Sequence, residues 1–433
     1  MLGVSAQPLS EEIAKANNLK IGDGLQIVAV VPSGTFAELG IKVGDILLTI
    51  NQKTIGTSQE LIASAQSLKT GDAVEITFLS NGQKLTKKGA AKARPKETSD
   101  YGEVILDEVD YELGTLRSII HVPKNKTGKL PTIFFLQGYP CSSQEFPPNS
   151  TNPFKKLIDD WVKSGFVVYR VERPNIGDSR TSKNCQDIDF AEEMAVNIAA
   201  YKKLLNYDYV DRSNVFLFGH SLGGIVAPLL AETYQPRGIL VYGTGVRSWF
   251  EYFVELHRVQ TIYFGGSNVE AEKIARELLP LYYEWLELGK SPAELKQNPR
   301  FKEILEAPNN ELNNSGDYFS GRHYKFWQTM NKTRMIEAWS RVESKVLAIY
   351  GEFDVQALNS QAAEEIVKVV NENHAGNGEF LLIPKAEHGF AKVDSYRQVT
   401  ELFSTGKYGQ YANENYNAEI GRLTTEWMNK VMK

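Results

Sequence analysis

The sequence is poor in cysteine, with only Cys141 and Cys185 among 433 residues. Composition alone leaves these two as free thiols or as a pair. The chain also lacks a long basic run, and its formal net charge is −5, so the charge pattern gives no indication of a nucleic-acid partner. No apolar stretch approaches the roughly 20 residues of a membrane-spanning helix. No signal peptide is recognisable either, because Leu2–Ser10 is too short and too polar to be the hydrophobic segment of a signal peptide.

The remaining composition is that of a folded protein. Hydrophobic residues make up 42% and charged residues 23% of the chain. Because 433 residues exceed what one core usually holds, we expect two or three domains. No His, Cys or Asp cluster has the spacing of metal ligands, so we expect neither a metal nor another cofactor.

The most informative motif is F-L-F-G-H-S-L-G-G at 216–224, which contains G-x-S-x-G. An apolar strand-like run ends at Gly219, and a helical run begins just after Ser221. This arrangement is typical of a nucleophile elbow, in which the serine takes a strained backbone conformation and exposes its hydroxyl. Side chains at 219 and at Gly223 would collide with the turned backbone. The purely structural alternative is a tight turn with a buried serine.

The first ninety residues form a separate pattern. We expect a strand at 25–31, a short helix at 36–39, a turn and strand at 40–51, a helix at 58–68 with Ser58 as N-cap, and a hairpin of 73–78 with 83–87. After the segment S-G-T-F-A-E-L-G, the pattern G-(apolar)-x-x-G-D-x-(apolar)-x-x-(apolar)-N runs from Gly40 to Asn51. Residues 1–88 therefore resemble a PDZ domain of the bacterial high-temperature-requirement protease type.

The PDZ resemblance implies a peptide site. In such domains a short loop offers backbone N–H groups to a peptide's C-terminal carboxylate, and the peptide adds to the sheet as an edge strand. The matching segment here is Leu2, Gly3 and Val4. The alternative is a PDZ domain that only packs on its neighbour and binds no ligand.

The rest of the chain reads as a larger α/β domain. Residues 89–102 are poor in apolar side chains and rich in Ala and Lys, as in a linker. From 103 to 433, strands alternate with helices, which predicts a mostly parallel sheet covered on both faces. The stretch from about 246 to 342 breaks this alternation. It is helical in pattern and dense in aromatics, so we expect a cap inserted over the carboxyl edge of the sheet.

A nucleophilic serine needs a histidine base, and that base needs an acid to orient it. His388 is the one histidine in a loop beyond the last predicted strand, and the remaining five have structural explanations: His121, His220, His257, His323 and His374. The acid lies in A-I-Y-G-E-F-D at 348–354. We favour Asp354 over Glu352 because it lies two residues further from the strand, where it can reach across the sheet edge.

The oxyanion of such a reaction needs two prepared donors. One is the backbone N–H of Leu222, directly after the serine. The other should come from Q-G-Y-P-C at 137–141, and Tyr139 is the candidate because Pro140 has no N–H.

These motifs together resemble the α/β-hydrolase superfamily over 103–433. The matching pieces are G-H-S-L-G-G, the G-E-F-D turn, the E-H-G-F loop and Q-G-Y-P. The resemblance implies an α/β-hydrolase fold, a mostly parallel sheet with helices on both faces and an inserted helical cap, preceded by the small α+β PDZ domain. Gln137 departs from the pattern, since many members carry His there, but its amide can still anchor the loop. V-E-R-P-N-I-G-D-S at 171–179 matches a loop that supports the elbow.

In the fold that this resemblance implies, both cysteines lie at the edge of the sheet that carries the active site. We predict a Cys141–Cys185 disulfide that tethers the oxyanion loop. A disulfide places the chain in an oxidising compartment. The PDZ type agrees with this by analogy, so a periplasmic or secreted protein is expected.

The residues predict a serine hydrolase that cleaves carboxylic esters through an acyl-enzyme. A peptidase or amidase with PDZ-guided capture of peptide C-termini uses the same triad, so the motifs alone do not separate the two. A third interpretation is a PDZ adaptor with a degenerate hydrolase fold. The natural substrate and the oligomeric state do not follow from the sequence.

Overall fold

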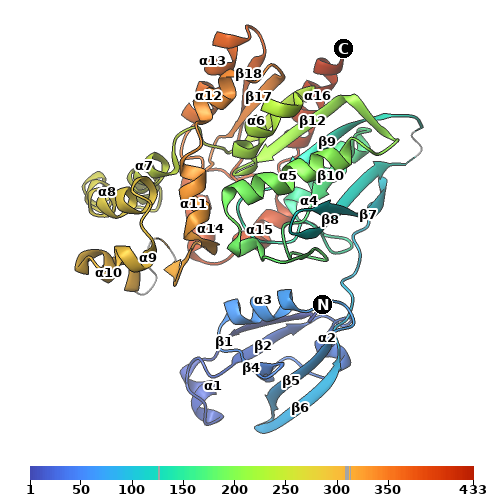
Figure 1. The fold of residues 1–433 in the computed structure, drawn as a ribbon. Coiled ribbons are helices and arrows are strands. Elements are labelled where there is room, and N and C mark those ends of the chain that lie inside the picture. The colour runs from blue at the N-terminus through green and yellow to red at the C-terminus, as the bar shows by residue number, and fades with distance from the viewer. Residues whose placement is uncertain (125–126, 308–311, 313) are drawn as a thin grey trace. The chain divides into compact units, whose positions relative to one another are not determined.

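The computed structural model describes residues 1–124, 127–307, 312 and 314–433 (Figure 1). The chain divides into two compact units, Met1–Lys96 and Glu97–Lys433. This division falls within the stretch 89–102 that the sequence indicates as a linker.

The first unit is a small sheet with three helices. Its strands follow the order β1-β2-β3-β5-β6, and β4 pairs with β3. The elements are β1 (Val4–Pro8), α1 (Glu11–Ala16), β2 (Leu25–Val30), α2 (Thr35–Glu38), β3 (Ile46–Ile50), β4 (Lys53–Thr54), α3 (Ser58–Ser67), β5 (Ala73–Ser80) and β6 (Gln83–Ala90). Asn81 and Gly82 join β5 to β6 with φ of 49° and 77°, as a two-residue hairpin turn requires.

The cap of α3 differs from the prediction by one residue. Thr57, not Ser58, is the N-cap: its hydroxyl accepts from the Glu60 N–H at 3.2 Å. The Glu60 carboxylate in turn accepts from the Thr57 N–H at 2.9 Å. The reason is the glutamate three residues after Thr57, which completes a reciprocal capping box that Ser58 could not form.

The second unit is built on a sheet of the order β11-β8-β10-β9-β12-β13-β17-β18, with β7 also pairing with β8. Strand β8 runs antiparallel to β7, β10 and β11, whereas β10, β9, β12, β13, β17 and β18 run parallel to one another. The strands are β7 (Gly102–Tyr111), β8 (Gly114–Pro123), β9 (Leu130–Leu136), β10 (Val167–Val171), β11 (Arg180–Thr181), β12 (Val210–His220), β13 (Gly238–Tyr242), β17 (Lys345–Gly351) and β18 (Gly378–Ile383). This strand order is that of the α/β-hydrolase fold.

Helices cover both faces of this sheet. Along β9, Ile133 and Phe135 belong to one buried cluster, and Phe134 and Leu136 to another, because successive side chains point to opposite faces. The first cluster is closed by α4 (Pro153–Lys163) and α16 (Glu419–Met432). The second is closed by α5 (Phe190–Leu204), α6 (Gly223–Tyr234) and α13 (Gln361–Asn373). The apolar strands predicted from the sequence are therefore buried on both sides.

Between β13 and β17 the chain forms the insertion, which is largely helical (Figure 1). It contains α7 (Trp249–Tyr263), α8 (Asn268–Tyr282), the π-helix η2 (Tyr283–Glu287), α9 (Pro292–Leu295), α10 (Pro299–Glu306), β14 (Asn314–Ser315), β15 (Tyr318–Phe319), β16 (Arg322–His323), α11 (Tyr324–Asn331) and α12 (Met335–Ser340). The three short strands were not anticipated, because two-residue strands leave no periodic pattern. Outside the insertion lie η1 (Cys185–Asp187), α14 (Tyr396–Ser404) and α15 (Tyr408–Glu414). Among the helices described, none has both the length and the apolar character needed to cross a membrane.

Candidate active site

Ser221 lies at the turn between β12 and α6. Its backbone has φ of +53°, a left-handed conformation that non-glycine residues rarely adopt. The Ser221 N–H donates to the Tyr242 carbonyl on the adjacent strand at 2.9 Å, which fixes the turn against the sheet. Strain of this kind persists only where the surroundings enforce it, and it is typical of functional sites.

The glycines of the motif are required by close backbone contacts. A Cβ atom at Gly219 would lie 2.5 Å from the Gly223 carbonyl oxygen. A Cβ atom at Gly223 would lie 2.0 Å from the Leu136 carbonyl oxygen on β9. Both distances are far below van der Waals contact, so the predicted collisions are confirmed.

His388 and Asp354 meet beyond the carboxyl ends of β18 and β17. The His388 Nδ1 atom lies 2.8 Å from Oδ2 and 3.0 Å from Oδ1 of Asp354. Asp354 Oδ1 also accepts from the N–H groups of Gln356 and Ala357, at 2.9 and 2.8 Å. Glu352, the competing acid, instead accepts from the Lys385 N–H at 2.8 Å.

The electrostatics of this pair define which atom can act as a base. Burial alone would raise the pKa of Asp354, but His388 and the two N–H donors outweigh it and lower that pKa. Burial alone would lower the pKa of His388, but Asp354 outweighs it and raises that pKa above 6.5. Asp354 is therefore ionised at neutral pH and holds a proton on Nδ1, which leaves Nε2 of His388 as the atom free to take one.

Ser221 and His388 line the same cavity, which has a volume of about 880 Å³. Tyr139 and Leu222 line it as well, so four of the five residues predicted for the triad and oxyanion hole face one space, and the fifth, Asp354, is buried. No hydrogen bond joins the Ser221 hydroxyl to His388 among the residues described. Contacts of this type are often long in unliganded sites and tighten when substrate binds.

The loop after β9 runs beside the serine. A Cβ atom at Gly138 would lie 3.5 Å from the Ser221 Cβ, so the backbone passes at contact distance. Within the described ranges, neither the Tyr139 N–H nor the Leu222 N–H donates to another protein group. Gln137, the departure from the family pattern, places its Nε2 atom 3.5 Å from the Val171 carbonyl.

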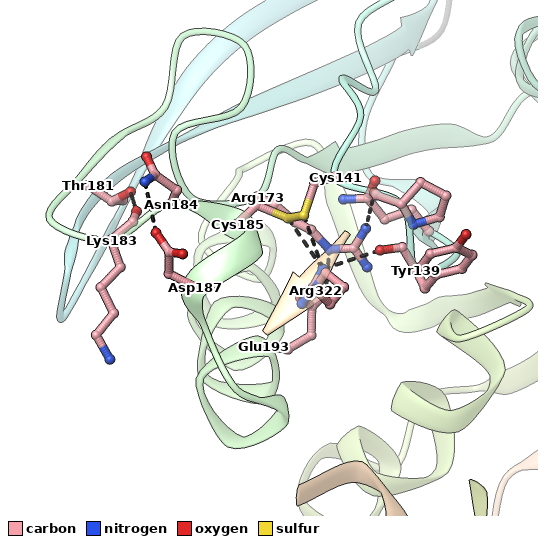
Figure 2. Close-up of a disulfide and its surroundings, with 12 residues drawn as sticks. Tyr139, Cys141, Arg173, Thr181, Lys183, Asn184, Cys185, Asp187, Glu193 and Arg322 are labelled. Carbon is pink, nitrogen blue, oxygen red and sulfur yellow. Dashed lines mark hydrogen bonds and ion pairs between the residues drawn. A yellow bond between two sulfur atoms is a disulfide. The ribbon is translucent and has the colours of Figure 1, made fainter. Parts of the chain in front are cut away.

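The loop after β9 is fastened by a disulfide, as predicted. Cys141 and Cys185 are bonded, with their Cα atoms 5.8 Å apart across 44 residues of sequence (Figure 2). Two residues of the 171–179 loop also hold the segment after β9. The Glu172 carboxylate accepts from the Gln144 N–H at 2.9 Å, and Arg173 donates to the Pro140 carbonyl at 2.7 Å.

Sequence reasoning missed two residues that hold the His388 loop. His220 places Nε2 2.8 Å from the His388 carbonyl oxygen, and burial lowers its pKa to about 3, so it is a neutral donor. The Glu387 carboxylate accepts from the N–H groups of Gly389 and Ala391, at 2.9 and 2.7 Å. His220 occupies the variable position of the motif, where the pattern carries no signal for such a role.

Aromatic side chains of the cap form one wall of the cavity. Trp327 lies 5.9 Å from the Tyr139 ring and stacks on Trp249 at 5.3 Å, and Trp249 stacks on Tyr252 at 4.7 Å. All four line the cavity. Other cap aromatics, such as Trp285, are buried in the core of the cap. No group of three or more His, Cys, Asp or Glu residues in the described parts of the chain is placed to hold a metal ion.

The predicted peptide-binding segment of the first unit begins its edge strand. Leu2 is buried, Gly3 has φ of +70°, and Val4 pairs with Val30. Strand β1 pairs only with β2 in the described sheet, so its other edge is unpaired. Figure 1 shows β1 and α3 within this unit.

Comparison with known proteins supports the PDZ resemblance of the first unit. Residues 1–88 match the PDZ domain family. The periplasmic pH-dependent serine endoprotease DegQ of Escherichia coli K12 is 33% identical over 85 residues, which is 20% of this chain and 19% of that protein. The periplasmic serine endoprotease DegP of Salmonella typhimurium LT2 is 29% identical over 85 residues, which is 20% of this chain and 18% of that protein. The chain thus spans about a fifth of the length of these two relatives. The family match shows that residues 1–88 form a PDZ domain.

Solved esterases are among the structures to which this chain is similar. Est1E from Butyrivibrio proteoclasticus aligns with a TM-score of 0.42 and 15% identity, covering 70% of this chain and 98% of its own. A carboxyl esterase from Bacillus coagulans aligns with a TM-score of 0.45 and 13% identity, covering 77% and 100%. The assignment of the second unit to the α/β-hydrolase fold rests on its own strand order. The chain thus joins a PDZ domain to an α/β-hydrolase domain.

Proposed function

We propose that this protein is a serine hydrolase that cleaves carboxylic esters through an acyl-enzyme. The observation that carries the proposal is that His388, paired with the buried Asp354, lines one cavity together with Ser221, whose backbone is left-handed. A hydroxyl becomes a useful nucleophile only when a neighbouring base takes its proton. The geometry offers that base and an acid that fixes its tautomer.

The reaction follows from the positions of these groups. Ser221 Oγ attacks the ester carbonyl while its proton passes to Nε2 of His388, and Asp354 stabilises the imidazolium. The N–H groups of Leu222 and Tyr139 receive the oxyanion; the loss of one such donor lowers the rate by about 100–1000-fold. His388 then protonates the leaving alcohol. A water molecule, activated by the same imidazole, releases the acid and restores Ser221.

The cavity wall favours an apolar or aromatic group in the substrate. Trp249, Tyr252 and Trp327 offer flat apolar surfaces near the serine. Ring-to-ring packing adds about 0.5–1.5 kcal/mol beyond the burial of apolar area. We therefore expect kcat/KM to rise from acetyl to longer or aromatic acyl esters.

The test is a panel of p-nitrophenyl esters of increasing acyl length, measured beside aminoacyl-p-nitroanilides. The proposal predicts release of p-nitrophenol by the wild type and none above background by Ser221→Ala. Turnover of the anilides but not of the esters would favour a peptidase. Inactivity of both proteins towards every substrate would favour the adaptor.

A peptidase or amidase is the second candidate, and the PDZ domain favours it. The relatives of residues 1–88 are serine endoproteases, and the unpaired edge of β1 suits an added peptide strand. Leu2, Gly3 and Val4 would then bind the C-terminal carboxylate. A peptide that ends in a free carboxylate should bind the full chain more tightly than its C-terminal amide, as measured by fluorescence anisotropy.

We further infer an oxidising location, periplasmic or secreted. The Cys141–Cys185 disulfide supports it, because cytosolic reductants keep most thiols reduced. The periplasmic relatives of the PDZ domain agree with it. Mass spectrometry of native protein after alkylation should find no labelled cysteine, and two labelled cysteines would remove this inference.

A further inference from the structure

A buried arginine of the cap contacts the loop that carries Tyr139. Arg322, on β16, is 0% exposed. Its Nη1 atom donates to the Tyr139 carbonyl at 3.2 Å and lies 3.4 and 3.3 Å from the sulfur atoms of Cys141 and Cys185. Figure 2 shows the guanidinium between the disulfide, Tyr139 and Glu193. The contact therefore joins the insertion to the loop after β9.

The charge of Arg322 is balanced inside the protein. Its Nη2 atom lies 3.0 Å from Oε2 of Glu193, whose Oε1 atom accepts from Arg173 Nε at 2.7 Å. Its guanidinium also lies 3.8 Å from the centroid of the Phe326 ring. Burial and Arg173 lower the pKa of Arg322 to about 10, so it stays charged at neutral pH.

The two arginines hold consecutive carbonyl groups of one loop. Arg322 binds the carbonyl of Tyr139, and Arg173 binds that of Pro140. Arg173 comes from the segment after β10, whereas Arg322 comes from the cap. Hydrogen bonds from a charged donor are stronger than neutral ones. The loop is thus held from the body of the domain and from the cap at neighbouring residues.

This arrangement matters because an oxyanion donor must be placed before the reaction begins. Gly138, just before Tyr139, leaves the backbone free to rotate, whereas the carbonyl bond from Arg322 and the contact of the Tyr139 ring with Trp327 restrict it. An error of about 1 Å in such a group can lower the rate about 100-fold.

We propose that Arg322 is a positioning residue that holds Tyr139 so that its N–H faces the oxyanion formed at Ser221. The inference rests on the proposed function, because it requires an oxyanion at this place. It adds that the cap, in addition to covering the cavity, sets the geometry of the oxyanion hole. Arg322 contacts no reacting atom, so its effect passes through Tyr139.

The test compares Arg322→Met with wild type on a p-nitrophenyl ester that the wild type hydrolyses. The substitution leaves Arg173 and Glu193 as a balanced pair, which reduces the risk of unfolding. We expect kcat to fall by about ten- to a hundredfold while KM stays within about twofold, because ground-state binding does not use the oxyanion hole. Arg322→Lys, which keeps a charged donor, should recover part of the loss.

Arg334→Met is the matched control, since Arg334 lies in the same insertion with a side chain that is 81% exposed. It should keep wild-type kcat. All variants are assayed below their measured melting temperatures; if Arg322→Met does not fold, Arg322→Lys carries the test with the same expected direction. Unchanged kcat, or a change confined to KM or to the melting temperature, overturns the role of Arg322. A wild type that hydrolyses no ester overturns the proposed function, and this inference with it.

Discussion

His220 lies at the variable position of the nucleophile motif, yet it contacts the loop that carries His388. Its Nε2 atom is 2.8 Å from the His388 carbonyl, and Phe154 and Phe390 pack on its ring at 5.0 Å. Because its pKa is lowered to about 3, the ring stays neutral over the working range of most enzymes. It therefore donates a steady hydrogen bond to the loop.

We predict that His220→Phe lowers kcat for an ester substrate by about tenfold, because His388 loses one of the bonds that place it. The apolar ring also leaves the buried His388 carbonyl without this donor, so the variant is assayed below its measured melting temperature. His374→Phe, in the turn before β18, is the control. Equal kcat for His220→Phe and wild type would show that the other contacts of the loop suffice.

The pH profile tests the pairing of His388 with Asp354. The proposed mechanism needs neutral His388, so kcat/KM should rise with pH through the pKa of His388, which Asp354 raises above its ordinary value. Asp354→Asn removes the anion that stabilises the imidazolium, so the acidic limb should move to lower pH. The plateau should fall roughly 10³–10⁴-fold because the tautomer is no longer fixed.

Glu352→Gln is the matched control for the acid, because Glu352 was the competing candidate and contacts the backbone of Lys385. It should keep both the plateau and the position of the limb. A large loss in Glu352→Gln together with a small loss in Asp354→Asn would reverse the assignment of the acid.

At the scale of elements, the disulfide joins the loop after β9 to η1. A cross-link of this kind is commonly worth about 2–4 kcal/mol of unfolding free energy. We predict that a reductant lowers the melting temperature of the wild type and reduces its kcat. The double variant Cys141→Ser with Cys185→Ser should behave like the reduced wild type and should not respond to reductant. A fully reduced wild type with unchanged melting temperature would contradict this prediction.

The elements show what the sequence could predict. The strands of the large sheet were recognisable because they are buried on both faces and so form continuous apolar runs such as T-I-F-F-L. The G-x-S-x-G turn was recognisable because close backbone contacts require glycine at 219 and 223. The cap of α3 was misplaced by one residue, since two adjacent hydroxyl residues compete and only Thr57 has a glutamate three residues later.

The partners of Arg322 could not be predicted from the sequence. Glu193 and Tyr139 are 129 and 183 residues away from Arg322, and contacts over such separations leave no local pattern. The disulfide was predictable because a family resemblance placed both cysteines at one edge of the sheet.

At the scale of the whole molecule, the segment before the hydrolase sheet is anchored. Glu97, within the stretch expected to be a linker, is buried 3.0 Å from Arg170 Nη2 and 2.9 Å from His121 Nε2. It also accepts from the Phe146 N–H at 2.9 Å. Burial would raise the pKa of Glu97, but Arg170 and His121 outweigh it and lower the pKa to about 2.

We predict that Glu97→Gln lowers the unfolding free energy of the full chain by about 3–5 kcal/mol, because Arg170 is left buried without a carboxylate. Since the folded pKa lies below 4.5, this contribution is present above pH 4.5 and is lost as the pH falls towards 2. Glu103→Gln, at an exposed position on β7, is the control. Urea denaturation at pH 7 measures both, and equal midpoints would contradict the prediction.

The central claim is that Ser221, His388 and Asp354 act together as one nucleophilic site. The most direct measurement is the mass of the protein after treatment with a fluorophosphonate, followed by peptide mapping. The account predicts one adduct on the peptide that contains Ser221, slower labelling of Asp354→Asn and none of Ser221→Ala. Absence of labelling in the wild type, or equal labelling of Ser221→Ala, would contradict it.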